Sequence, residues 1–238
     1  MRDYVFYVTN KQKHVGLAVQ SAASVKKHCT LKIQTVLFFV GSLGGDKHGF
    51  DICVNIPVIP DCSWWRQQTL AMPQVIDHFK PTDRLLYMDC DTYAIGDVAP
   101  LFALLEVADI AGAHSPRRYN NQPDQGNMPR SFAEYNIGVN IMRASENVRK
   151  LWDKAAIFFD AVGDDSGYDD QIALHEALWW MLNENPRFRC AVFPSEWNCR
   201  FNFPGSAGKD VIVLHGAADD MEAAVKKVNS TPNSIRSW

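Results

Sequence analysis

Two aspartates, Asp89 and Asp91, follow an apolar run at residues 85–88 in the stretch DRLLYMDCDTYAIGDV. Residues two apart in an extended segment place their side chains on the same side of the chain. Two close carboxylates repel each other unless a positive group joins them, and hard divalent cations such as Mg²⁺ and Mn²⁺ take oxygen ligands. The pair therefore predicts a metal site, with ordinary strand-end polarity as the other interpretation of so short a motif.

His215 follows a second short apolar run at residues 211–214 and precedes Gly216. Two aspartates and this histidine at converging strand ends would leave three metal positions open for diphosphate oxygens and water. Taken alone, a capping or core histidine is the simpler interpretation of His215. The metal prediction therefore depends on whether the fold brings the three side chains together.

Polar residues within two further predicted elements add to this pattern. Gly138 interrupts an apolar strand, which indicates close approach of a ligand or a backbone segment. Asn136 and Asn140 on either side of it offer amides suited to sugar hydroxyls, or mark an incidental bulge. Asp169 and Asp170 open a helix, where they serve as an N-cap and as complements to the helix dipole.

The elements that must position these residues follow from hydrophobic periodicity. Strands are predicted at 4–9, 33–40, 52–59, 84–88, 109–113, 135–142, 189–193 and 211–214, and helices at 14–28, 64–80 (broken or kinked at Pro73), 97–105, 147–159, 169–183 and 219–228. The alternation in the first half favours an α/β fold with a mostly parallel central sheet flanked by helices. Ligands bind such sheets beyond the carboxyl ends of the strands, where the two aspartates lie. The polar segment 115–134 is predicted to be a long, functional or mobile loop that governs the acceptor, and 229–238 a tail.

Composition limits the function classes that fit this chain. The 238 residues suit one large α/β domain or two small ones, and the net charge of −3 argues against electrostatic binding to nucleic acid. No apolar run approaches the roughly 20 residues of a membrane span. The first residues lack a signal-peptide pattern, and the six cysteines contain no CxxC pair. We therefore expect a cytoplasmic protein whose cysteines are thiols.

The stretch LLYMDCDTYAIGDVAPLF resembles the signature of GT-A fold glycosyltransferases, which use nucleotide-diphospho sugars. The resemblance is strongest to the glycogenin and lipopolysaccharide galactosyltransferase group. It extends over residues 3–216, with further short matches in the same order along the chain: Thr9-Asn10, Asn136-Ile-Gly138-Val139, Asp170-Gln171, Trp197-Asn198 and His215-Gly216.

This resemblance implies a function and a set of site residues. Residues 1–238 would form one GT-A domain, with a nucleotide-binding half at 1–114 and an acceptor-binding half at 115–238. Asp89, Asp91 and His215 would bind Mn²⁺, with Mg²⁺ as the alternative. Thr9, Asn10, Cys90, Asn136, Gly138 and Gly216 would join them at the donor, and Asp170 and Gln171 would be the catalytic residues. The donor would be a UDP-sugar, with GDP as the alternative nucleotide, the acceptor a glycan or other hydroxyl compound, and the anomeric configuration retained.

One departure from the family and two competing functions stay open at this point. The family often has a lysine a few residues after the metal histidine that contacts the diphosphate, and residues 215–220 contain none. Lys209, Arg117, Arg118 and Arg200 are the candidate replacements. A haloacid-type phosphatase also uses DxD at a strand end, but Tyr93 stands where that signature has Thr or Val. A non-catalytic carbohydrate-binding protein is the other alternative.

Overall fold

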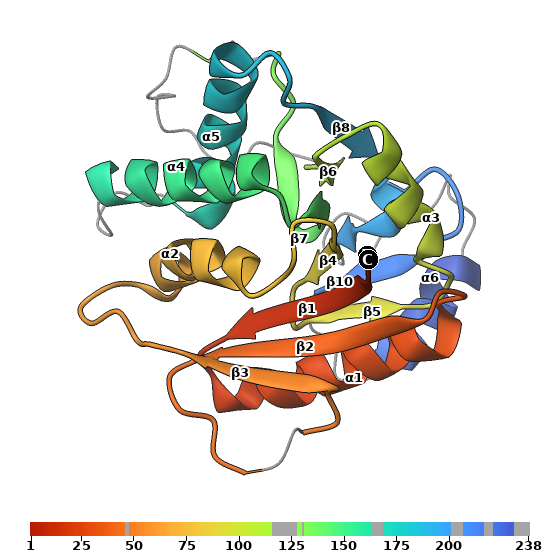
Figure 1. Ribbon diagram of the computed structural model, residues 1–238. Helices are drawn as coiled ribbons and strands as arrows, with labels where there is room; N and C mark the ends of the chain where they lie inside the picture. The colour runs from red at the N-terminus through yellow and green to blue at the C-terminus, as the bar shows by residue number, and fades with distance from the viewer. Residues whose placement is uncertain are drawn as a thin grey trace.

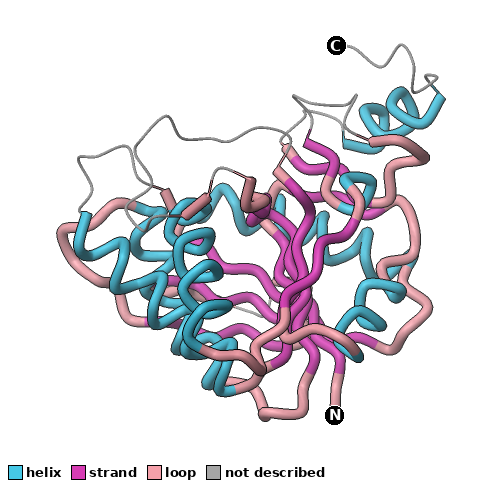
Figure 2. The backbone as a smooth tube through the Cα atoms, turned by 90° about the horizontal axis from the view of Figure 1, so that it is seen from above, coloured by secondary structure: helices cyan, strands magenta, loops and turns pink. Residues whose placement is uncertain are grey.

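The computed structural model describes residues 1–45, 48–115, 128–129, 131–162, 169–200, 207–216 and 221–230. Within them, a seven-stranded sheet lies between two groups of helices (Figure 1, Figure 2). The strands of this sheet are β1 (Asp3–Thr9), β2 (Ile33–Val40), β3 (Ile52–Ile56), β4 (Arg84–Met88), β6 (Ile110–His114), β7 (Tyr135–Arg143) and β8 (Cys190–Phe193). Their order across the sheet is β3-β2-β1-β4-β7-β6-β8.

The direction of β7 distinguishes this sheet from a purely parallel one. Strands β3, β2, β1 and β4 pair in parallel, and so do β6 and β8. Strand β7 runs antiparallel to both of its neighbours, β4 and β6. The prediction of a mostly parallel sheet is therefore confirmed, and β7 is an exception that local periodicity did not reveal.

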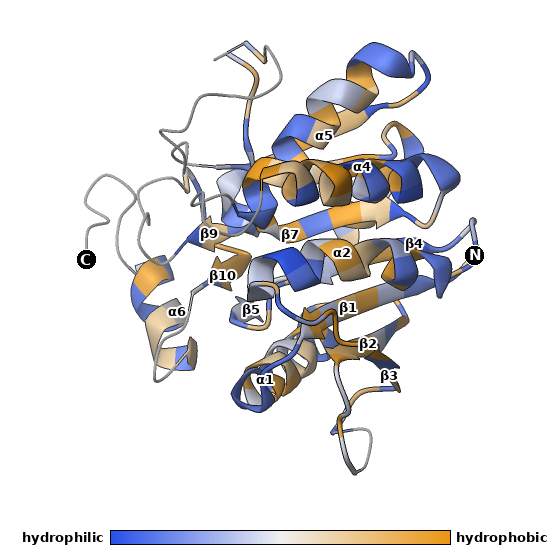
Figure 3. Cartoon of the chain, turned by 90° about the vertical axis from the view of Figure 1, so that its left-hand side faces the viewer, coloured by the Kyte–Doolittle hydropathy of each residue, from blue (hydrophilic) through white to orange (hydrophobic). Residues whose placement is uncertain are grey.

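The inner strands are apolar on both faces because helices cover both faces. In β1, Phe6 and Val8 belong to one buried cluster, while Val5 and Tyr7 belong to a second cluster on the opposite face. This alternation is the period of two that an extended strand imposes. In Figure 3 the strands are largely coloured as hydrophobic, whereas the helices carry both colours.

Helices from different parts of the chain cover the two faces. One face packs against α2 (Trp64–Asp77), α4 (Glu146–Val162) and α5 (Asp170–Glu184), and the other against α1 (Gln12–His28) and α3 (Ala99–Ala103). A 3-10 turn, η1 (Leu104–Glu106), continues α3, and a later helix, α6 (Met221–Ser230), belongs to a third and smaller cluster. None of the described helices is long and apolar enough to cross a membrane.

A second sheet of three short strands lies beside the carboxyl end of β4. It contains β5 (Thr92–Ala94), β9 (Cys199–Arg200) and β10 (Val213–His215), in the order β5-β10-β9. Strand β10 is antiparallel to β5 and parallel to β9. The sequence predicted neither β5 nor β9. The strand predicted at 211–214 stops one residue before His215, whereas in the structure His215 is the last residue of β10.

Several other predicted boundaries change for identifiable reasons. Strand β3 is an edge strand and ends at Ile56, directly before Pro57, because proline cannot donate to a ladder. Helix α2 ends at Asp77 and continues through the buried Pro73, so of the predicted break or kink there the break is wrong and the kink stays a prediction. The six cysteines are thiols, as expected. Parts of some predicted segments lie outside the described residues. They are most of the acceptor loop (116–127 and 130), residues 217–220, and most of the tail (231–238).

Candidate metal and donor site

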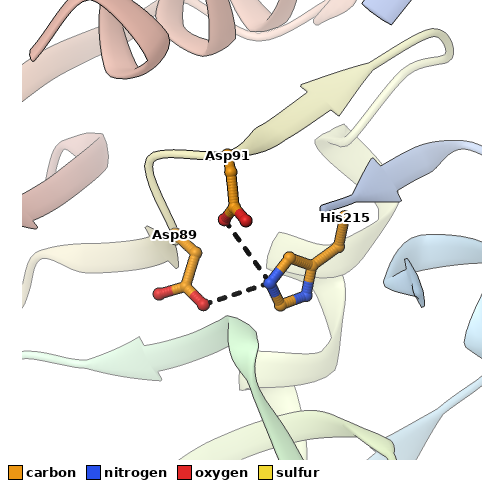
Figure 4. A group of neighbouring side chains, drawn as sticks. All are labelled: Asp89, Asp91 and His215. Atoms are coloured by element: carbon orange, nitrogen blue, oxygen red, sulfur yellow. Dashed lines mark ion pairs between the residues drawn. The ribbon is translucent and has the colours of Figure 1, made fainter. Parts of the chain in front are cut away.

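The two aspartates lie in a tight turn that joins the two sheets. Asp89 continues the pairing of β4, because its backbone N–H donates to the carbonyl of Gly138 at 2.8 Å. The chain then reverses, and the N–H and hydroxyl of Thr92 both donate to the carbonyl of Asp89, at 3.1 and 2.7 Å. Both carboxylates consequently point toward His215 (Figure 4). The predicted convergence is present, but a turn produces it rather than an extended strand.

His215 completes the group from the second sheet. Its Nε2 lies 3.2 Å from Asp89 Oδ2 and 3.6 Å from Asp91 Oδ1, and the ring is buried. Strand β10 pairs antiparallel with β5, so that His215 is opposite Thr92, the residue after Asp91. The N–H of Gly216 donates to the carbonyl of Asp91 at 3.0 Å, and its φ of 128° is one that glycine adopts readily.

Gly138 leaves the space that the imidazole of His215 occupies. A Cβ atom at this position would lie 2.0 Å from Cε1 and 2.3 Å from Nδ1 of His215. No side chain fits at such distances, so any larger residue would displace the histidine. A close approach at Gly138 is therefore present, but the approaching group is the histidine ring and not the ligand or backbone segment that the sequence suggested.

An asparagine pair determines which nitrogen of His215 carries the proton. Asn198 Nδ2 donates to Oδ1 of Asn136 at 2.9 Å, which leaves Asn198 Oδ1 to face His215 Nδ1 at 2.8 Å. Because an amide oxygen only accepts, Nδ1 carries the proton and Nε2 presents its lone pair toward the carboxylates. Both asparagines are buried. Both support the histidine, and the sugar contact suggested by the sequence for Asn136 stays a prediction.

A second chain of hydrogen bonds orients Asp89. The buried hydroxyl of Tyr87 donates to Asp89 Oδ1 at 2.5 Å and itself accepts from the side chain of Gln68. Burial raises the pKa of Tyr87 well above its ordinary value, and the charge of Asp89 adds to this, so the hydroxyl keeps its proton. Oδ1 is thus held, and Oδ2 faces His215.

Two groups around Asp89 favour its ionised form. Burial raises the pKa of this carboxyl, whereas the hydrogen bond from the Tyr87 hydroxyl and the charge of Arg200 lower it. Two carboxylates and one imidazole, whose ligand atoms all lie within 4.8 Å of one another, form a donor set for a divalent cation. With Nε2 presenting a lone pair, the side chains present fit such an ion.

Two solved structures share the arrangement of this chain, although no family model and no curated protein matches its sequence. Both are of LgtC: an active-site mutant in which glutamate replaces glutamine, and the galactosyltransferase in complex with donor and acceptor sugar analogs. Their TM-scores are 0.68 and 0.65. Each is 14% identical to this chain, and the matches cover 96% of it and 94% and 95% of the LgtC chains. The chain has the GT-A fold. At this identity the likeness concerns the fold alone, and it confirms the fold class expected from the sequence.

In this GT-A chain, a cleft of about 280 Å³ opens beside the two aspartates. The sheet, α1, α2, α5 and β9 all contribute to its lining: Val8, His14, Leu17, Trp64, Trp65, Gln68, Asp89, Cys90, Asp91, Ile137, Asp169, Asp170, Gln171 and Arg200. It lies beyond the carboxyl ends of β1 and β4, the position at which α/β sheets bind ligands. Five of these residues carry no signal of this role in the sequence: His14, Leu17, Trp64, Trp65 and Gln68.

Among the residues predicted to bind the donor, Thr9 is turned into the protein, and Cys90 lines the cleft with its thiol directed inward. Thr9 is fully buried, and its hydroxyl accepts from the N–H of Lys11 at 3.2 Å. The thiol of Cys90 points to the carbonyl of Val8 at 3.8 Å, and burial raises its pKa. Asn10 is half-buried, and its Oδ1 has no hydrogen-bond partner among the described residues.

The two residues predicted to be catalytic differ in their surroundings. Asp169 caps α5 by accepting from the N–H of Ile172 at 2.9 Å. Asp170, the next residue, lines the cleft, and burial followed by the charges of Asp169 and Asp89 raises its pKa well above the ordinary value. Gln171 also lines the cleft, but its amide donates to Glu134 and accepts from the backbone N–H of Ile137. Gln171 therefore also connects α5 to β7.

Proposed function

We propose that this protein is a metal-dependent glycosyltransferase that moves a sugar from a nucleoside diphosphate to a hydroxyl acceptor. The group formed by Asp89, Asp91 and His215 carries the proposal, because it lies at the cleft of a chain with the GT-A fold. We propose Mn²⁺ as the metal, UDP as the nucleotide and retention as the stereochemical course. The solved LgtC complex contains donor and acceptor sugar analogs, which supports the proposal of a sugar donor and a sugar acceptor here.

The proposed chemistry assigns separate tasks to two groups of residues. Asp89, Asp91 and His215 would hold the cation, which when bound supplies a Lewis acid for the leaving diphosphate. At the start of α5, the buried and charged surroundings that raise the pKa of Asp170 favour its neutral form. A neutral carboxyl both donates and accepts hydrogen bonds, which suits the hydroxyls of a sugar. Gln171 would position this end of α5 through its bonds to Glu134 and Ile137.

The acceptor side of the proposal rests on two tryptophans at the start of α2. Trp64 and Trp65 both line the cleft, and Trp65 is 54% exposed. Exposed indole rings offer a flat apolar surface with a polar edge, which suits the apolar face of a sugar ring. We therefore propose a carbohydrate acceptor that contacts Trp65. A phosphatase would have no evident use for such a surface, and a carbohydrate-binding protein without activity would have none for the metal group.

Substitution of Asp91 tests the proposed function most directly. Asp91→Ala removes one ligand at a partly exposed position, so we expect loss of Mn²⁺-dependent transfer and donor hydrolysis with the fold retained. The measurement is product mass across a panel of sugar nucleotides, with Mn²⁺ and with excess EDTA. Asp160→Ala is the matched control, because Asp160 is an exposed carboxylate that pairs with Arg66 at the surface. Full activity of Asp91→Ala, or of the wild type in EDTA, would contradict the metal assignment.

A further inference from the structure

Arg200 lies against the same nitrogen of His215 that faces the two aspartates. Its Nη1 donates to His215 Nε2 at 3.0 Å, and the two residues are partners in the pairing of β9 with β10. Asp89 Oδ2 and Asp91 Oδ1 lie 3.2 and 3.6 Å from that nitrogen. A guanidinium group therefore adjoins the ligand atoms that the proposed cation would use.

The arginine and a metal ion cannot use this nitrogen at the same time. A neutral imidazole has one lone pair on its unprotonated nitrogen, and the bond from Asn198 Oδ1 to Nδ1 places that lone pair on Nε2. Guanidinium has only donors and keeps its charge in proteins, so it interacts with Nε2 through the lone pair. A metal bound to Nε2 requires the same lone pair. Metal binding must therefore release Arg200 from His215.

The cleft offers the released arginine a place near the proposed donor. Arg200 already lines the cleft, and the described lining also includes four carboxylates: Asp89, Asp91, Asp169 and Asp170. Among the described lining residues, His14 and Arg200 are the basic ones. Of the other candidate cations, Lys209 is exposed and is not part of this lining, and Arg117 and Arg118 lie outside the described residues. Planar guanidinium groups bind phosphate oxygens through paired hydrogen bonds.

We propose that Arg200 is a diphosphate-binding residue that exchanges partners when the metal binds. In this structure it donates to His215, and with metal on Nε2 it turns to the diphosphate of the donor. It thereby supplies a positive charge that residues 215–220 do not provide. The inference rests on the proposed function, because it requires that the cleft receives a nucleoside diphosphate. It also requires positive coupling between the binding of metal and the binding of nucleotide. Each ligand binds better to the protein in which Arg200 has left His215, so each raises the affinity for the other.

Titration of Mn²⁺ and UDP into the purified full chain tests this exchange. Arg200→Ala removes the competitor for Nε2, so we expect Mn²⁺ to bind more tightly than to the wild type when no nucleotide is present. With saturating Mn²⁺, loss of hydrogen bonds to a charged group is expected to weaken UDP binding by about tenfold to a hundredfold. Electron paramagnetic resonance of free Mn²⁺ gives the first affinity, and isothermal titration calorimetry with UDP gives the second. Lys209→Ala is the matched control, since it removes an equal charge from an exposed residue outside the described cleft lining, and both affinities should stay at the wild-type values.

Each contrary result identifies what fails. If the wild type binds Mn²⁺ and Arg200→Ala binds it no more tightly, the exchange is wrong and the proposed transferase function stands. An equal gain of Mn²⁺ affinity in Lys209→Ala would also overturn the exchange, because net charge would then explain it. If the wild type binds neither Mn²⁺ nor UDP, the proposed function itself fails. Arg200→Gln, which keeps a donor without the charge, carries the same expectations if Arg200→Ala does not fold.

Discussion

The aspartates and the histidine of the candidate metal site come from two regions that are built differently. Asp89 follows β4, a strand that pairs with β1 and β7 inside the large sheet and whose residues 85–88 are buried. His215 ends β10, a strand of three residues in the small sheet. Backbone pairing therefore positions the aspartates, whereas the histidine ring depends on individual side chains around it.

The side chains that fix His215 are specific and few. Asn198 accepts from its Nδ1, Asn136 holds Asn198, and Gly138 leaves room for the ring. By contrast, the turn at Asp89 keeps two backbone bonds, to Gly138 and from Thr92, whatever its carboxylate contacts. The histidine side of the site should therefore be the more sensitive to single substitutions.

The largest effect is expected at Gly138. In Gly138→Ala the new Cβ would meet the ring of His215 at 2.0 Å, so the ring must leave its position and Mn²⁺ binding and transfer should be lost. Gly16→Ala is the matched control, because nothing lies within 4 Å of a Cβ there, and alanine in α1 should stabilise the protein by about 0.5–1 kcal/mol. Mn²⁺ titration and thermal unfolding measure both variants. Wild-type Mn²⁺ affinity in Gly138→Ala would refute the account of the histidine.

Intermediate effects are expected from the two supporting hydrogen bonds. The ratio of the two losses of Mn²⁺ affinity tests whether the histidine side is more sensitive than the aspartate side. Asn198→Ala removes the group that fixes the tautomer of His215, and loss of such a partner typically weakens metal binding about 10–100-fold. Tyr87→Phe removes one hydrogen bond to Asp89 while the backbone turn persists, so a loss of about tenfold at most is expected. The measurement is the Mn²⁺ affinity of each variant relative to the wild type. A larger loss in Tyr87→Phe would reverse the proposed difference between the two regions.

The smallest effect is expected at Trp65, which belongs to neither region. Trp65→Ala should leave Mn²⁺ affinity unchanged and raise the KM for a carbohydrate acceptor by about threefold to tenfold, the size of an aromatic contact. Trp65→Phe keeps a flat apolar surface, so its KM for the acceptor should be close to that of the wild type. Steady-state kinetics at saturating donor measure the two variants. A change in Mn²⁺ affinity of equal size would show that the metal group and the acceptor surface are not separate.

Local sequence patterns predicted the strands and helices that bury continuous apolar stripes. Residues 33–40 and 84–88 were assigned correctly as β2 and β4, because apolar runs of this length need burial on both faces. The cap at Asp169 was also recognisable, since its side chain bonds to an N–H only three residues away. The three metal-ligand candidates were named from residue type and position, and the structure brings them within 4.8 Å of one another.

Contacts between distant segments could not be predicted in this way. The antiparallel direction of β7, the three-residue β5 and the two-residue β9 exist because partner strands are present, and no local period encodes a partner. Asn198 lies 62 residues from Asn136 and 17 from His215, so its sequence position gave no sign that it supports the histidine.

The sequence by itself determined which chemical groups are available: two aspartates after a buried strand, a histidine after another, and a glycine within a third. Only the tertiary structure decided how they are used. It placed the histidine ring in the space above Gly138, the lone pair on Nε2, and Arg200 against that lone pair. The physical reason is that residue types limit possible hydrogen bonds and ligands, whereas the selection among them depends on distances between atoms far apart in the chain.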